Sequence, residues 1–291
     1  MSRRWYVTHT LKKFFFPLIT LLLATLLGVL ASQRTPLPLI RGDVLNDNQR
    51  TTAASSNSLR VSTYNIHSAI GHDGRSSIER VAEVLSTPPL DIIALQEVAG
   101  DLLGESNQVR ELAGLLDLGW LYAPTRKKHF SAKFGNAFLS SHEIKNYEVK
   151  PLLWERRDRS GTQVSRLNRN LVTVTIQFQE QQVTILITHL DRGPLRLEQL
   201  SDVIAQFRKH RHAILMGDLN SKRSAPPLSA LLASGEATDA IVATEAEGDN
   251  EAHKRVDWIL TRGFRVIDGG LHPRGTSDHP QFWSELQLIE P

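Results

Sequence analysis

Five apolar runs in this 291-residue chain end abruptly in acidic, amide or imidazole side chains. The segments are Tyr64-Asn65-Ile66-His67, Gln96-Glu97, Thr188-His189-Leu190, Gly217-Asp218-Leu219-Asn220 and Ser277-Asp278-His279. Each run predicts a buried strand that delivers polar groups to the edge of a sheet. Five such strands can place their polar ends in one cleft. Carboxylates together with imidazoles are what the binding of a hard divalent cation and a phosphate requires.

The charge balance differs between the first residues of the chain and its body. The whole chain carries a formal charge of +3, but residues 1–41 hold six basic and no acidic residues, so the remainder is slightly acidic, at about −3. This argues against non-specific nucleic-acid binding through net charge. The absence of cysteine excludes disulfides, a thiolate nucleophile and a cysteine-ligated zinc site.

Residues 14–31 carry no charge and follow the basic residues Arg3, Arg4, Lys12 and Lys13. A run of this length is just sufficient for a membrane-spanning helix, and the preceding positive charges keep the N-terminus in the cytoplasm. We therefore expect a single-pass membrane anchor with the body on the extracytoplasmic side. The alternative is a signal peptide cleaved after the small-residue segment 29–31, which would release a secreted protein.

The chain then divides into a linker and one domain. Residues 32–58 are rich in Ser, Thr, Asn, Asp, Gln and Pro and predict a flexible tether. Residues 59–291 are long enough for one large domain with a substantial core. The predicted organisation is an anchor or signal at 1–31, a linker at 32–58 and a single domain at 59–291.

The body alternates between strand and helix patterns. Strands are predicted at 59–65, 91–97, 135–141, 170–178, 182–188, 212–218, 255–261 and 280–288, and helices at 76–86, 105–117, 194–209 and 226–234. Residues 183–187 and 213–216 are almost wholly apolar, as in strands covered on both faces. Pro194 and Pro226 suit the first turn of a helix. The pattern predicts an α/β domain in which two packed sheets are flanked by helices.

Asp218 and Asn220 form the first candidate site pair. Residues two apart on an extended chain face the same way, so the carboxylate could deprotonate a water while the amide donates to a phosphate. The structural alternative is a turn, because Gly-Asp and Asn-Ser sequences are common in turns.

Glu97 ends a strand and is a natural oxygen ligand for magnesium, although a solvated acid at a strand end is the simpler interpretation.

Histidine supplies the second group of candidates. Asn65 and His67 share a face, and a lone histidine beside a strand is more often structural than a ligand. His189 is followed by acidic and basic residues, and an imidazolium there would donate charge-assisted hydrogen bonds to a phosphate. Asp278 and His279 form an acid–imidazole pair, in which the acid fixes the tautomer or holds the proton.

Asp257 is an acid within an apolar strand and should face a polar site, because burial without a partner is costly.

The order of these motifs resembles the endonuclease/exonuclease/phosphatase superfamily, which includes apurinic-site endonucleases, type I DNase, neutral sphingomyelinases and inositol-phosphate 5-phosphatases. The resemblance covers roughly residues 59–288. It implies a four-layer α/β sandwich, with two mixed sheets packed face to face and flanked by helices, here preceded by an N-terminal hydrophobic helix. Tyr64-Asn65-Ile66-His67 with Gly71-His72-Asp73-Gly74-Arg75 most resembles small bacterial members, some of them membrane-associated.

The resemblance also implies a role for each candidate residue. Glu97 would be the principal ligand of a magnesium ion, or of manganese in its place, assisted by Asn65. Asp218 would activate the attacking water, Asn220 would hold the scissile phosphate, and His189 and His279 would stabilise the developing charge. Asp278 would orient His279 or bind metal, and Asp257 would support the His189 side of the cleft. Asn136 would line the site.

His67 departs from the family pattern, because nucleases of the family often have an acid at this position. We expect His67 to contact substrate, and we do not transfer the acid's role to it. The stretch 156–170 follows the family pattern only loosely, so no catalytic residue is assigned there.

Three functions therefore remain open at this point. The first is a membrane-tethered or exported phosphoesterase that hydrolyses a lipid headgroup, another phosphodiester or a phosphomonoester by in-line water attack. The second is a secreted or anchored magnesium-dependent nuclease. The third, a non-catalytic phosphate- or lipid-binding module, requires a missing site residue, and none is missing. The predicted partners are the phosphoester substrate and, through the N-terminal helix, a membrane; no motif indicates an obligate protein partner.

Overall fold

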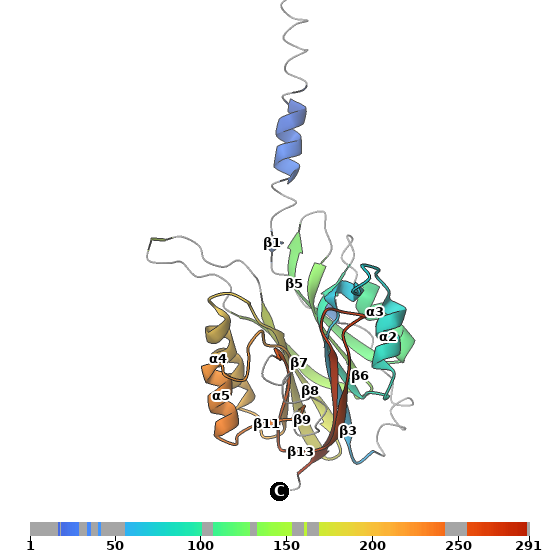
Figure 1. The fold of residues 1–291 in the computed structure, drawn as a ribbon, viewed down its shortest axis with the longest axis vertical. Helices are drawn as coiled ribbons and strands as arrows, with labels where there is room; N and C mark the ends of the chain where they lie inside the picture. Colours follow the sequence, from blue (N-terminus) through green and yellow to red (C-terminus); the bar gives the residue numbers. More distant parts are fainter. Residues whose placement is uncertain are drawn as a thin grey trace, which may run out of the picture.

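The computed structural model describes residues 17, 19–28, 34–35, 40–41, 56–100, 107–128, 133–152, 160–161, 169–241 and 255–289. These residues form two β-sheets packed face to face with helices on both outer faces (Figure 1). The predicted four-layer sandwich is confirmed. A helix at residues 19–28 precedes it, as expected. Of the rest of the predicted 14–31 segment, residue 17 is described, and residues 14–16, 18 and 29–31 lie outside the described residues.

The larger sheet is built around strands β3 and β4. It runs in the order β1-β5-β6-β4-β3-β14-β13, with β2 paired to β5. Its strands are β1 (Arg34–Thr35), β2 (Ile40–Arg41), β3 (Leu59–Asn65), β4 (Ile92–Ala99), β5 (Gly119–Lys128), β6 (Lys133–Ser140), β13 (Phe264–His272) and β14 (Gln281–Leu288). Only the β3–β4 pair is parallel, so the sheet is mixed.

The second sheet runs in the order β11-β12-β10-β9-β8-β7. Its strands are β7 (Ile144–Pro151), β8 (Asn170–Phe178), β9 (Gln181–His189), β10 (Ala213–Asp218), β11 (Thr238–Asp239) and β12 (Asp257–Arg262). Here the β9–β10 pair is parallel. The helix that connects these two strands packs on the outer face of the sheet, as crossover connections between parallel strands require.

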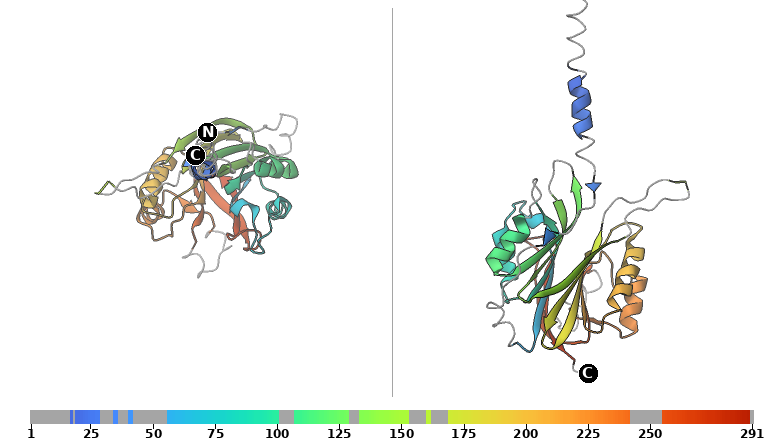
Figure 2. Two further views of the ribbon diagram at one scale, coloured as in Figure 1. Left: turned by 90° about the horizontal axis from the view of Figure 1, so that it is seen from above. Right: turned by 180° about the vertical axis from the view of Figure 1, so that it is seen from behind.

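Four α-helices cover the two sheets (Figure 2). Helices α2 (Ile78–Leu85) and α3 (Asn107–Leu116) cover the larger sheet, and α4 (Arg196–Phe207) and α5 (Pro226–Ala233) cover the other. A short 3-10 helix, η2 (His67–Ala69), follows β3. Ser77 caps α2, because its side chain accepts a hydrogen bond from the Arg80 N–H. Pro226 starts α5 as predicted, whereas Pro194 lies before Leu195, the N-cap of α4.

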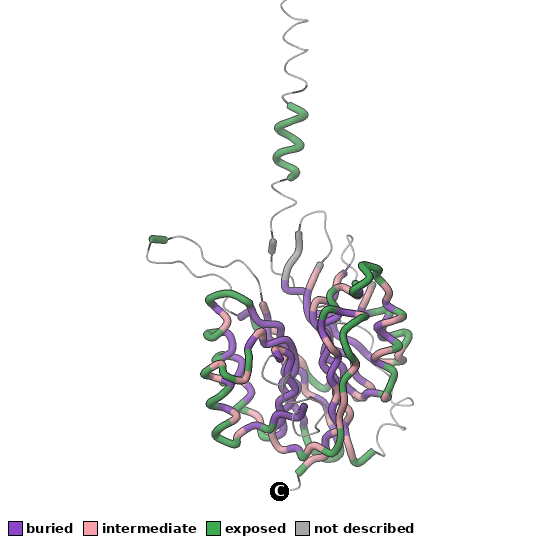
Figure 3. The backbone as a smooth tube through the Cα atoms, viewed as in Figure 1, coloured by how far each residue is buried: buried purple, intermediate pink, exposed green. Residues whose placement is uncertain are grey.

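Three apolar layers hold the sandwich together. The central layer joins the facing surfaces of the two sheets and includes Val61, Ile92, Ile185 and Ile214. The two outer layers join each sheet to its helices. Central strands are therefore apolar on both faces, as the uninterrupted runs predict, and Figure 3 shows them buried along their length.

Gly217 lies where β10 passes the main chain of β9. Its φ of +142° is unfavourable for a side chain, and an added Cβ would lie 1.9 Å from the carbonyl oxygen of Thr188. Only glycine fits this close approach. The backbone is therefore held in place immediately before Asp218, the last residue of the strand.

The structure differs from the sequence-based prediction at several strands. Strands β5, β7 and β13 were not predicted, nor were the short strands β1, β2 and β11. Strands β1 and β2 lie within the predicted flexible linker and pair with β5. Residues 42–55 of that linker lie outside the described residues. The domain boundaries therefore stay predictions.

Replacement of Gly217 by alanine tests the close approach of the two strands. We expect Gly217→Ala to lower the free energy of unfolding by roughly 3 kcal/mol or more, because the main chain must move to relieve the contact. Gly114→Ala in α3 is the control: no atom lies within 4 Å of the added Cβ, and the change should be stabilising by about 0.5–1 kcal/mol. Urea unfolding of both variants measures the difference. Equal midpoints for Gly217→Ala and the unmodified protein would contradict the prediction.

Candidate functional site

Neighbouring strands of the second sheet bring three polar residues to one level. Asp218 ends β10, lies opposite His189 on the parallel strand β9, and lies opposite Asp257 on the antiparallel strand β12. Side chains that lie opposite each other on neighbouring strands, on the same face of the sheet, are about 5 Å apart. Asp257 is the first residue of β12, not an interior residue as predicted.

The larger sheet completes the site from the other side. Asn65 ends β3, and its Nδ2 donates a 3.2 Å hydrogen bond to Oδ2 of Asp218. Ser277 fixes the loop before β14: its hydroxyl donates a 2.6 Å hydrogen bond to the carbonyl oxygen of Asn65 and accepts one from the N–H of His279. The site therefore spans both sheets at one end of the sandwich.

Glu97 reaches the site through a β-bulge. The sequence predicts that β4 ends at Glu97, but the strand continues to Ala99, and its pairing with β6 shifts between Leu95 and Val98. Glu97 has a φ of +58°, an uncommon conformation for a residue other than glycine. A bulge redirects a side chain out of the strand alternation. The Glu97 carboxylate lies 3.9 Å from Nε2 of His189, and 17% of its side chain is exposed.

Asp218 is the most connected residue of the site. Its Oδ2 lies 3.3 Å from Nε2 of His189 and 3.8 Å from Nε2 of His279, and its Oδ1 accepts the N–H of Asn220 at 2.9 Å. Burial, followed by the charge of Asp257, raises the pKa of Asp218 to about 7, although His279 and the hydrogen bonds from Asn220 and Asn65 act in the opposite direction. The carboxylate therefore changes protonation near neutral pH.

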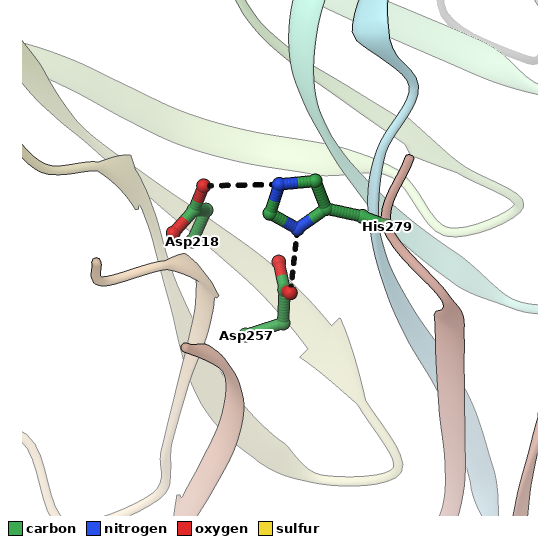
Figure 4. A group of neighbouring side chains, drawn as sticks. All are labelled: Asp218, Asp257 and His279. Atoms are coloured by element: carbon green, nitrogen blue, oxygen red, sulfur yellow. Dashed lines mark hydrogen bonds and ion pairs between the residues drawn. The ribbon is translucent and has the colours of Figure 1, made fainter. Parts of the chain in front are cut away.

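His279 lies between two carboxylates (Figure 4). Its Nδ1 lies 2.7 Å from Oδ2 of Asp257, and its Nε2 faces Asp218. Burial lowers the pKa of His279, but the hydrogen bond and charge of Asp257, together with the charges of Asp218 and Asp278, outweigh that effect and raise the pKa to about 9. At neutral pH this ring is an imidazolium, which can stabilise negative charge that develops on a bound substrate.

His67 and Asp278 lie at the exposed rim of the site. His67 Nδ1 is 3.9 Å from Oδ1 of Asp278, and about half of each side chain is exposed. The N–H of His67 donates to Oδ1 of Asn65, which ties this rim to the buried part of the site. Both side chains are accessible from solvent, and the predicted contact of His67 with substrate stays a prediction.

Asn220 makes contacts that the sequence does not reveal. Its Nδ2 donates to the carbonyl oxygen of Leu190 at 2.9 Å, and its Oδ1 accepts from Nε of Arg192 at 3.2 Å. These two bonds fix the orientation of the amide and leave one N–H for a ligand. Arg192 is exposed, and this contact holds it beside the site. The sequence gives no specific signal for Arg192 or for the role of Ser277.

Asn136 occupies a buried position beside the site. It lies opposite the bulge of β4, and its Nδ2 donates a 2.8 Å hydrogen bond to Oδ1 of Asn170. The carbonyl oxygen of Asn170 in turn accepts from the hydroxyl of Thr188. The contacts described for Asn136 thus connect the two sheets. Its predicted contact with substrate stays a prediction.

The donor set suits a hard divalent cation. Carboxylate and amide oxygens are the ligands that magnesium prefers. In the described part of the chain, Asp218, Asp257 and His279 place ligand atoms within 4.8 Å of one another, and the buried Oδ1 of Asp257 has no hydrogen-bond partner. Asn65 contacts Oδ2 of Asp218, and the Glu97 carboxylate lies beside His189, which faces the same oxygen. The residues therefore fit a metal ion, and its identity is a matter for proposal.

Comparison with known proteins agrees with this fold. A family model described as "Endonuclease/Exonuclease/phosphatase family" matches residues 62–279. The chain therefore belongs to the endonuclease/exonuclease/phosphatase family. Members of this family are hydrolases that act on phosphoester bonds, and they generally use a divalent metal ion. No curated protein sequence matches the chain.

Solved structures show the same fold at low sequence identity. An endonuclease/exonuclease/phosphatase from Beutenbergia cavernae is 24% identical with a TM-score of 0.64, over 79% of this chain and 72% of that one. The human Nocturnin catalytic domain, with a bound sulfate anion, is 18% identical with a TM-score of 0.62, over 80% and 94%. A mannosyl-6-phosphatase from Bacteroides thetaiotaomicron is 16% identical with a TM-score of 0.59, over 80% and 100%.

The ion pair between Asp257 and His279 predicts a testable titration. In the protein with metal removed by a chelator, we expect His279 to titrate at about 9 by NMR. Asp257→Asn should lower that pKa markedly, because it removes the charge that the ring contacts. Asp278→Asn is the control and should lower it less, because Asp278 acts only through its charge. A His279 pKa near 6.5 in the unmodified protein would contradict the assignment.

The same pair predicts how stability depends on pH. Because the pKa of folded His279 lies above its ordinary value of 6.5, its stabilising contribution is complete below pH 6.5 and is lost as the pH rises through 9. The free energy of unfolding of the metal-free protein should therefore fall across this interval. Asp257→Asn should make the pH dependence flatter in urea unfolding measured at pH 6.5 and pH 9.5, and identical slopes would argue against the pair.

Proposed function

We propose that this protein is a metal-dependent phosphoesterase that hydrolyses a phosphodiester or phosphomonoester by in-line attack of water. The observation that carries the proposal is the set of contacts around Asp218. A buried carboxylate with a pKa of about 7 suits a general base at neutral pH, because it can accept a proton from water and release it again. Nε2 atoms of two histidines lie within 4 Å of its Oδ2.

The imidazole groups would stabilise the charge of the transition state. His279, held protonated by Asp257, and His189 both face the carboxylate that would activate water. Phosphoryl transfer depends mostly on positioning and on electrostatic stabilisation, so preorganised donors are the main contribution that a protein can make. Asn220 has one amide N–H available, and it holds Arg192 where its terminal guanidinium N–H groups can reach a phosphate.

Glu97 and Asn65 are proposed to hold a magnesium ion, with manganese as a substitute. The bulge brings the Glu97 carboxylate to the site, and its partial exposure allows an ion there to keep several waters. When bound, the ion would neutralise phosphate charge and activate water as a Lewis acid.

We also propose that the N-terminal apolar segment places the protein at a membrane with its catalytic domain on the extracytoplasmic side. Basic residues before an apolar segment favour this orientation. Within the described residues, no helix combines the length and the apolar composition needed to cross a membrane. Secretion after cleavage of the segment is the alternative, and N-terminal sequencing of the mature protein distinguishes the two.

The first test is hydrolysis of bis(p-nitrophenyl) phosphate and p-nitrophenyl phosphate by the full chain with magnesium. We expect Asp218→Asn to lower kcat by about 10²–10⁴-fold, because the general base is lost. Glu79→Gln, at an exposed position of α2, should leave kcat unchanged. Circular dichroism confirms that each variant is folded. An active Asp218→Asn variant would refute the role of Asp218, and an unmodified protein without activity on any phosphoester would favour a binding module.

Plasmid DNA in the same assay tests the alternative function. Cleavage of DNA at a rate well above that of the small phosphodiesters would favour a nuclease. The slightly acidic body of the chain leads us to expect the opposite result.

The second test concerns the metal. We expect Glu97→Gln to raise the magnesium concentration needed for half-maximal activity by about 100-fold or more, because loss of a direct ligand should cost at least as much as the about 10–100-fold lost with a group that only supports a ligand. Asp73→Asn, which removes an exposed acid paired with Arg80, is the control and should leave the magnesium dependence unchanged. A magnesium titration of both variants measures the shift. An unchanged dependence in Glu97→Gln would place the ion elsewhere, with the Asp218, Asp257 and His279 group as the next candidate.

A further inference from the structure

The N-terminal strands join the larger sheet at the end that carries the site. Strand β1 pairs with the last residues of β5, Arg34 opposite Lys128 and Thr35 opposite Lys127. Strand β6 pairs with both β5 and β4. This pairing places the last residues of β5 past the level of Glu97, toward the end of the sheet that carries the site. Strand β1 thus lies at the site end of β5, and β2 pairs with an earlier part of β5, where Ile40 lies opposite Tyr122. Figure 1 shows β1 at the same end as the N-terminal helix, whereas the C-terminus lies at the opposite end.

The connection from the apolar segment to β1 is short. The uncharged run at 14–31 ends three residues before Arg34, a span of roughly 10 Å at most when extended. Glu97 on β4 lies three strands away from β1, or about 14 Å, and four to five residues along the strands from the level of β1, or about 15 Å. The site therefore lies within roughly 30 Å of the last residue of the apolar run.

The helix that precedes this connection is apolar over most of its circumference. Its large side chains are between 47% and 65% exposed, and none of them is buried against the domain: Ile19, Leu21, Leu22, Leu23, Leu26 and Leu27. At 100° per residue these positions surround most of the helix, whereas a helix that docks in a protein groove needs only one apolar face. A lipid bilayer is the partner that accommodates apolar side chains on all sides.

We propose that strand β1 holds the mouth of the site toward the bilayer that receives the N-terminal helix, so that the substrate is the headgroup phosphodiester of a membrane glycerophospholipid. This inference rests on the proposed phosphoesterase activity and names its substrate class. The arrangement is a tether that raises the effective concentration of the catalytic site at the lipid surface. A tether at the C-terminal end of the sandwich would instead direct the site away from the membrane.

The experiment compares one headgroup in two physical forms. The full chain is reconstituted with vesicles of phosphatidylglycerol and phosphatidylethanolamine with magnesium present. Water attacks phosphorus and one P–O ester bond breaks, so the released headgroup is measured both as the free alcohol, which leaves phosphatidic acid, and as its phosphomonoester, which leaves diacylglycerol. The parallel arm uses dihexanoyl lipids with the same headgroups, kept below their critical micelle concentration. We expect the unmodified protein to hydrolyse the vesicle lipid faster than the soluble lipid.

Two insertions of the same length test the role of the tether. Twenty Gly and Ser residues between Ser32 and Gln33, before β1, should lower vesicle hydrolysis by about tenfold or more, because the longer tether lowers the effective concentration. The same insertion between Asn46 and Asp47, after β2, should have no effect, because β1 and β2 still pair with β5. Hydrolysis of the soluble lipid should be equal in both variants.

The outcomes separate the inference from the function on which it rests. Equal vesicle hydrolysis by the two insertion variants would overturn the orientation. Hydrolysis of bis(p-nitrophenyl) phosphate without hydrolysis of vesicle lipid would overturn the substrate class and leave the phosphoesterase intact. Absence of hydrolysis of every phosphoester would refute the proposed function itself.

Discussion

The buried carboxylate of Asp218 connects the two sheets at one end of the sandwich. It accepts a hydrogen bond from Asn65 of the larger sheet and faces His189 of its own sheet and His279 of the loop before β14. Burial of a charge without partners is strongly unfavourable, so these donors are needed for the fold as well as for chemistry. The same burial that raises its pKa to about 7 makes the group useful as a base at neutral pH. Stability and proposed activity thus depend on one set of contacts.

Much of the fold follows from apolar patterns in the sequence. Almost wholly apolar runs such as 183–187 and 213–216 predict central strands correctly, because both of their faces are covered. The strands that sequence reasoning misses have weaker patterns. Strand β7 is an edge strand with Lys145, Lys150 and Pro151, and β13 is an edge strand with two adjacent glycines. Edge strands need less apolar surface and tolerate such residues, so their signal resembles that of a loop.

The residue types of the site could be predicted from the sequence, but the directions in which the side chains point could not. Polar residues at the ends of apolar strands identify Asn65, His189 and Asp218, because alternation and strand order place them together. Glu97 reaches the site only through a bulge, which depends on pairing between β4 and β6 and has no local signature in the sequence. The amide of Asn220 is directed by Leu190 and Arg192, and tertiary contacts of this kind are set by the folded structure alone.

Backbone strain is concentrated where these directions are set. Among the described residues other than glycine, seven have a positive φ. Three of them, His67, Glu97 and Asn220, lie in the site segments, and two more, Ser68 and Ala69, directly follow His67. Each such conformation costs of order 1 kcal/mol or more, and it persists only when surrounding structure determines it. Here the buried strands β3 and β10 end shortly before these residues, strand β4 contains Glu97, and the three strands provide that support. The apolar layers therefore do more than stabilise the domain: they hold the chain ends in the conformations that bring carboxylates and imidazoles from both sheets into contact.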